Sequence, residues 1–145
     1  MLDESFEKVY RKFKMHFYQK VFEKWQGREV TLTTMETFCM EVIHAMNKPT
    51  INQFAKVANL SSPNAAYKVA NLVKKGYLEK QQSDDDKRVF YLVPTQKYID
   101  YYNISYHYVQ EVMSRMEGRF SKEEIETFEK ILVVMNDELM NDANF

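Results

Sequence analysis

A run of polar side chains recurs in the middle of the chain at the spacing of one helix face. These residues are Asn64, Tyr67, Lys68 and Asn71, at positions i, i+3, i+4 and i+7. An Asn amide can pair with adenine through two hydrogen bonds, and a Lys ammonium can reach guanine or a phosphate. A merely solvated helix face is the alternative, but the pattern favours a surface that reads nucleic acid.

The residues just before this face are suited to phosphate. Ser61, Ser62 and Pro63 stand at the predicted start of the helix, with Ser62 as N-cap and proline as the first helical residue. Serine hydroxyls and the free N–H groups of a helix N-terminus are good partners for phosphate oxygens. We therefore expect all three residues to lie at a DNA backbone.

A second candidate is a charged turn that ends in Asp85, Asp86, Lys87 and Arg88. An arginine on a hairpin tip can enter a minor groove, where narrow A·T tracts concentrate negative potential. Asp86 or Asp85 could hold the Arg88 guanidinium in a bidentate ion pair. Lys87 would contact a phosphate. The alternative is a hairpin tip whose charges are only solvated.

The chain has one cysteine, Cys39, which excludes an internal disulfide framework and a cysteine-based zinc site. Cys39 falls on an apolar helix face, and no basic residue at helical spacing would lower its pKa. The sequence therefore predicts a buried, inert thiol rather than a redox switch.

The spacing of the three histidines gives little support to a metal site or to catalysis. His16, His44 and His107 fall on three different predicted helices, and Glu41 with His44 is the nearest approach to a metal-binding pair. The sequence also has no nucleophile elbow and no glycine-rich phosphate loop. We expect no catalysis, no metal and no cofactor.

The composition bounds the class of protein. The chain has 145 residues, of which 45% are hydrophobic and 28% charged, a balance typical of a soluble globular domain. Three Gly and three Pro are too few for a loop-rich sandwich or barrel. No run of apolar residues approaches a bilayer span, and the N-terminus lacks an apolar signal core. We expect a cytoplasmic, mainly α protein.

Charge is unevenly distributed although the net charge is −1. Residues 48–91 carry eight Lys or Arg and four acids, which gives +4, whereas residues 121–145 carry two Lys and seven acids, which gives −5. This distribution suggests that the middle of the chain meets an anion and the C-terminal end does not.

Hydrophobic periodicity predicts helices over 5–25, 34–46, 50–57, 62–75, 95–117 and 121–140, and strands over 77–80 and 88–93. Capping boxes are predicted at Thr33 with Glu36, Thr50 with Gln53, and Ser121 with Glu124. Glycines 27, 76 and 118 are predicted helix stops. Buried positions are expected at Phe54, Val57, Ala66, Val69, Leu72 and Val73.

The order of these elements describes a winged helix-turn-helix, in which a hairpin follows the second helix of the pair. At this point the chain resembles the MarR family of bacterial transcription factors (multiple antibiotic resistance regulators). The resemblance is carried by Ser61–Asn64, Leu72–Leu78, Asp85–Arg88 and Thr95–Lys97, and it covers about residues 30–140. Tyr67 stands where the family often has arginine, which replaces a guanine reader with an aromatic able to touch a thymine methyl or a phosphate.

The resemblance implies a homodimer that binds duplex DNA and commonly represses transcription. Residues 1–28 would form a dimerisation helix, 29–94 the winged helix-turn-helix and 95–145 two further dimerisation helices. The family often binds small apolar or aromatic molecules, which suggests an effector site with Phe17, Phe38, His44 and Tyr102 as members. The alternatives are a winged helix used only for protein–protein contact, or a metal-responsive member of the same family.

Overall fold

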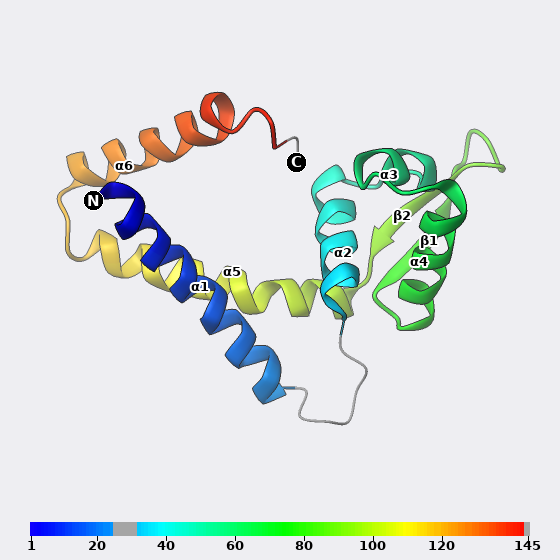
Figure 1. The fold of residues 1–145 in the computed structure, drawn as a ribbon, viewed down its shortest axis with the longest axis horizontal. Helices are drawn as coiled ribbons and strands as arrows, with labels where there is room; N and C mark the ends of the chain where they lie inside the picture. Colours follow the sequence, from blue (N-terminus) through cyan, green and yellow to red (C-terminus); the bar gives the residue numbers. More distant parts are fainter. Residues whose placement is uncertain (25–31, 144–145) are drawn as a thin grey trace. The chain divides into compact units, whose positions relative to one another are not determined.

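The structure, a computed structural model, describes residues 1–24 and 32–143 (Figure 1). Its elements are α1 (Leu2–Lys24), α2 (Thr34–Met46), α3 (Ile51–Val57), α4 (Ser62–Lys74), β1 (Leu78–Gln82), β2 (Phe90–Pro94), α5 (Gln96–Glu117), α6 (Lys122–Val134) and a π-helical turn, η1 (Met135–Leu139). The predicted mainly α winged helix-turn-helix is therefore confirmed. The predicted stop at Gly27 lies outside the described residues.

The chain divides into two compact units, one of Met1–Tyr18 with Ile104–Phe145 and the other of Gln19–Asn103. The second unit holds the hairpin with α2, α3 and α4 around it (Figure 1). Its core side chains come from all five elements; they include Cys39, Ile43, Phe54, Ala65, Val69, Leu72, Leu78 and Leu92.

The hairpin is a two-stranded antiparallel sheet in which Leu78 pairs with Pro94 and Gln82 with Phe90. Both strands begin later than predicted. The Tyr77 N–H donates to the Leu72 carbonyl and so still closes α4, and the Val89 N–H donates to the Asp86 carbonyl and so still belongs to the turn. The hairpin is joined to the helices by a hydrogen bond of 2.8 Å from Leu92 N–H to the Pro49 carbonyl.

Two of the three predicted capping boxes are complete. Thr50 with Gln53 and Ser121 with Glu124 each exchange both hydrogen bonds. Thr33 accepts from the Glu36 N–H, but the Glu36 carboxylate does not return to the Thr33 backbone. It accepts instead from the Thr33 hydroxyl and from Lys75, because a charged partner is available at the end of α4.

Four predicted positions on α3 and α4 need correction. Ser61, not Ser62, is the N-cap of α4, and its hydroxyl accepts from the N–H of Asn64. Val57, Ala66 and Val73 were expected in the core but are exposed. The helix repeat explains Ala66 and Val73: Ala65, Val69 and Leu72 share an arc of about 60° on α4, and a residue one position away is turned by about 100°.

The other unit contains α1, the second half of α5, α6 and η1. His16 stacks on Tyr108 with ring centroids 3.6 Å apart, and Phe13 meets the same ring edge-on at 5.6 Å, so α1 packs on α5. The predicted helix 121–140 is divided at Val134, where the backbone continues into η1. Among the described residues, no helix combines the length and low charge that a membrane span requires.

Candidate nucleic-acid interface

Helix α4 presents one side of its surface to solvent over its whole length. The buried arc lies toward the hairpin and α3, and the residues opposite it are Pro63, Tyr67, Ala70 and Lys74, all exposed. Tyr67 is 68% exposed. The sequence pattern correctly placed Tyr67 on the outer face. It missed Ala70, which is apolar, and Lys74, which lies beyond the i+7 position at which the predicted stripe ends.

The other predicted members of this face lie along one edge of it. Asn64 is exposed, whereas Lys68 and Asn71 are half-buried. Ser61, Ser62 and Pro63 are exposed at the start of the helix. The Ser61 hydroxyl oxygen accepts from the Asn64 N–H. This bond does not engage the hydroxyl hydrogen of Ser61. Of the four predicted residues on this face of α4, Asn64 and Tyr67 are the exposed ones.

The end of α4 is fixed by Gly76, the predicted helix stop, and by two residues at the start of α5. Gly76 has φ +83, a left-handed conformation that glycine adopts without strain, and it closes the helix. Thr95 donates to the Gly76 carbonyl at 2.6 Å, and Lys97 Nζ donates to the Lys75 carbonyl at 3.0 Å. A cation at the carbonyl end of a helix is favourable, so the start of α5 stabilises the end of α4.

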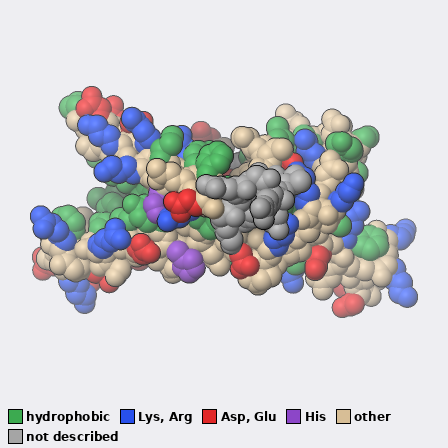
Figure 2. Space-filling view, turned by 90° about the horizontal axis from the view of Figure 1, so that it is seen from below, with side chains coloured by type: hydrophobic (Ala, Val, Ile, Leu, Met, Phe, Trp, Pro, Cys, Tyr) green, Lys and Arg blue, Asp and Glu red, His purple; other side chains and the backbone are tan. Residues whose placement is uncertain are grey.

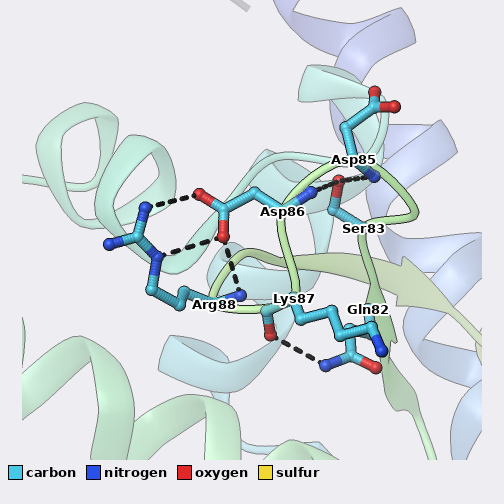
Figure 3. A network of polar contacts seen from close by, with 6 residues as sticks. All are labelled: Gln82, Ser83, Asp85, Asp86, Lys87 and Arg88. Atoms are coloured by element: carbon cyan, nitrogen blue, oxygen red, sulfur yellow. Dashed lines mark hydrogen bonds and ion pairs between the residues drawn. The ribbon is translucent and has the colours of Figure 1, made fainter.

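The turn between the strands is held by hydrogen bonds within itself (Figure 3). The buried Ser83 hydroxyl accepts from the N–H groups of Asp85 and Asp86, at 3.3 and 3.4 Å. Gln82 Nε2 donates to the Lys87 carbonyl at 2.8 Å. Ser83 and Gln82 were not predicted as part of the site; the serine at the first position of the turn was the available signal.

Arg88 is held by Asp86, one of the two predicted partners. Its Nε donates to one carboxylate oxygen and its NH2 group to the other, each at 3.1 Å, and its backbone N–H adds a third bond (Figure 3). These bonds lower the pKa of Asp86 and raise that of Arg88, so both stay charged. The Arg88 side chain is nevertheless 90% exposed. The pair therefore orients an arginine that remains available to a ligand.

Five lysine side chains between positions 48 and 87 reach the surface. Lys48, Lys56, Lys74, Lys80 and Lys87 are exposed. On the face drawn in Figure 2, blue Lys and Arg side chains and red Asp and Glu side chains are interspersed.

Three of the four predicted effector residues lie in the unit that carries the hairpin. The His44 ring meets Tyr102 edge-on at 4.8 Å and Tyr98 at 5.7 Å. Burial raises the pKa of the Tyr98 hydroxyl, and the Glu41 carboxylate adds to this effect. Phe38 is exposed on α2. Phe17 belongs to the other unit, on α1.

Cys39 is fully buried, as predicted. Burial raises the pKa of its thiol, and the nearby charge of Lys68 only partly opposes this. A raised pKa disfavours the thiolate, which is the reactive form. Across residues 1–24 and 32–143, no group of three or more His, Cys, Asp or Glu side chains is placed to hold a metal ion.

Residues 32–90, from two residues before α2 to the first residue of β2, match the model of the MarR family. This part of the chain is therefore similar to MarR-family proteins. The match contains all the predicted DNA contacts on α4 and on the hairpin tip. A comparison with curated proteins finds no match.

Solved structures of MarR-family proteins share the fold over nearly the whole chain. MepR of S. aureus bound to ethidium bromide is 18% identical, with a TM-score of 0.65 and 96% of each chain covered. FabT of Streptococcus pneumoniae in complex with DNA is 20% identical, with a TM-score of 0.61 and coverage of 97% of this chain and 99% of FabT. YusO of Bacillus subtilis is 14% identical, with a TM-score of 0.57 and coverage of 94% and 93%.

Proposed function

We propose that this chain is a transcriptional regulator, a repressor, that binds a pseudo-palindromic operator in duplex DNA as a homodimer. The observation that carries the proposal is the Arg88 side chain, which is oriented by Asp86 and almost fully exposed at the tip of a hairpin directly after an exposed helix. A solvated hairpin tip has no need of an oriented guanidinium, whereas a minor-groove contact does.

In this account α4 enters the major groove. Asn64 and Tyr67 contact base edges, Lys68 and Asn71 contact bases or phosphate, and Ser61, Ser62 and Pro63 lie at the backbone. Lys87 contacts a phosphate beside the groove that Arg88 enters. The DNA complex of FabT supports this use of the fold, since FabT shares it over most of both chains.

A second copy of the chain would cover apolar surface that one copy leaves open. No residue of α6 is buried, although all of α6 is described, and Ile131 and Val133 are each more than half exposed. On α1, Phe6, Val9 and Tyr10 are exposed as well. A helix of 13 residues is marginal in water without a packed face. Residues 1–28 and 95–145 are therefore proposed as dimerisation segments around a DNA-binding segment, 29–94.

The proposed effector is a small apolar or aromatic molecule bound near Phe38, His44 and Tyr102. An imidazole and a phenol hydroxyl beside aromatic faces supply the few polar groups that an apolar site uses to orient a ligand. The ethidium complex of MepR, which shares the fold, supports an aromatic ligand. Release requires that the ligand bind the DNA-free conformation more tightly than the DNA-bound one.

An electrophoretic mobility shift with duplex DNA from upstream of the protein's own gene tests the proposal. We expect a retarded complex of two chains per duplex, lost in Arg88→Ala and kept in Arg119→Ala, an exposed arginine in the turn after α5. A winged helix used only for protein contacts would retard no DNA. DNA release by zinc that is abolished in His44→Ala would replace the organic effector with the metal-responsive alternative.

A further inference from the structure

The outward surface of α4 is apolar along its centre, although it borders charged residues. Pro63, Ala66, Tyr67 and Ala70 are all exposed, and Val73 continues the surface at 38% exposure. We call Pro63, Ala66, Tyr67 and Ala70 the apolar ridge. A soluble helix normally places such residues against the core, yet the core side of α4 is already filled by Ala65, Val69 and Leu72. The ridge is therefore left for a contact outside this chain.

The polar groups beside the ridge limit what that contact can be. Helix α4 contains no Arg, Gln, Asp or Glu, so it lacks the forked guanine reader and the acceptor for cytosine. Lys74 lies at one end of the outer face, and the start of the helix offers backbone N–H groups and serine hydroxyls at the other. The outer face thus has a cation at one end, N–H and hydroxyl donors at the other, and apolar groups between them. This arrangement matches two rows of phosphates that flank base edges carrying methyl groups.

We infer that the apolar ridge reads the 5-methyl groups of thymines, so that each half-site centres on a short run of A·T pairs. This deepens the proposed function and rests on it. Alanine side chains are one carbon long and let the helix backbone approach the base edges closely, while the Tyr67 ring fills the space between neighbouring methyl groups. From Pro63 to Ala70 the helix rises about 10 Å, which spans about three base-pair steps.

Uracil substitution provides a direct test, because deoxyuridine lacks only the methyl group and keeps every hydrogen bond of thymine. The parent protein is first used to select its half-site from random duplexes. Each thymine is then replaced singly by deoxyuridine, and affinity is measured by fluorescence anisotropy. We expect two or three positions per half-site to lose about fourfold in affinity, the value for one buried methyl group, and the other positions to change little.

Protein variants connect the effect to the ridge. Tyr67→Ala should bind the thymine and uracil duplexes equally at one of the sensitive positions, whereas Tyr67→Phe should keep the parent's discrimination there. Asn64→Ala is the matched control: it lies beside the ridge, so it should weaken binding but keep the uracil effect. Circular dichroism of each variant confirms that α4 is folded.

Three results would overturn the inference. If a specific half-site is selected but uracil is tolerated at every position, methyl reading is wrong and the proposed DNA-binding function stands. The same holds if the selected half-sites are G·C-rich at their centre. If no duplex is bound specifically, the proposed function fails together with the inference, and the ridge is left as a surface for a protein.

Discussion

Lys75 Nζ donates a hydrogen bond of 2.7 Å to Oε1 of Glu36. The bond joins the C-cap residue of α4 to the first turn of α2. The two side chains are only 22% and 14% exposed. The other carboxylate oxygen of Glu36 is buried without a hydrogen-bond partner in the described residues. Lys75 is therefore the charged partner of a desolvated carboxylate, beside the Thr33 hydroxyl, which donates to the same oxygen.

Replacing Lys75 by methionine should destabilise the fold by about 1–3 kcal/mol, because it leaves a largely buried carboxylate without its charged donor. Lys74→Met is the matched control, since Lys74 is exposed and should cost well under 1 kcal/mol. Urea unfolding followed by circular dichroism measures both. The double variant Lys75→Met with Glu36→Leu should recover part of the loss. Equal costs for Lys74→Met and Lys75→Met would show that the bond contributes nothing.

Arg88→Ala should lower DNA affinity and reduce the slope of log affinity against log salt by about one, because one phosphate-directed cation is removed. Titrations at several salt concentrations give the slope, and Arg119→Ala provides the control. Asp86→Asn should weaken binding less than Arg88→Ala, since it loosens the guanidinium without removing it. Parental binding by Arg88→Ala at every salt concentration would show that the hairpin tip does not contact DNA.

Tyr98 predicts an alkaline loss of stability. Its buried hydroxyl ionises at a higher pH in the folded chain than in the unfolded one, so its contribution is complete below about pH 10 and is lost as the pH rises above that value. The parent should lose up to about 1.4 kcal/mol more per pH unit above pH 10 than Tyr98→Phe does. Tyr67→Phe, at an exposed tyrosine, should keep the parental slope. Urea unfolding between about pH 9 and 11 gives these slopes, and identical slopes for Tyr98→Phe and the parent would contradict the account.

Lys48 predicts a gain of stability on mutation. It has φ +60 in the connection from α2 to α3, next to Asn47 at φ +55, and a side chain in this region costs about 1 kcal/mol. Lys48→Gly should therefore be neutral or stabilise by up to about 1 kcal/mol, whereas Lys56→Gly within α3 should lose about that amount. A loss of 1 kcal/mol or more in Lys48→Gly, measured by urea unfolding, would show that its side chain has a stabilising contact.

Local signals were enough to predict most of the fold. Thr50 with Gln53 and Gly76 each mark a helix end through bonds made within a few residues, and these ends are where the sequence placed them. Errors arose where a choice depends on tertiary packing. Two adjacent alanines, 65 and 66, look alike in the sequence, and the packing of α4 on α3 and the hairpin decides that Ala65 is buried.

Local sequence signals also predicted those parts of the candidate site whose contacts join residues close together in the chain. Asp86 and Arg88 are two residues apart, so their pairing follows from the turn itself. The bond from Lys75 to Glu36 joins residues 39 positions apart and left no local signal beyond a pair of opposite charges. Pro63 and Tyr67 of the apolar ridge were predicted as DNA contacts, but Ala66 was expected in the core and Ala70 was missed because it carries no polar pattern.

Selection of bound duplexes from a random pool tests whether the chain binds a specific inverted repeat as a dimer. A two-fold dimer places its two copies of α4 in successive major grooves, so the enriched sequences should contain an inverted repeat with half-site centres about 10 base pairs apart, bound by two chains. Sequencing of the pool and sedimentation of the complex provide both readouts. No enrichment over the starting pool, or enriched sites that lack an inverted repeat and bind one chain, would contradict the account.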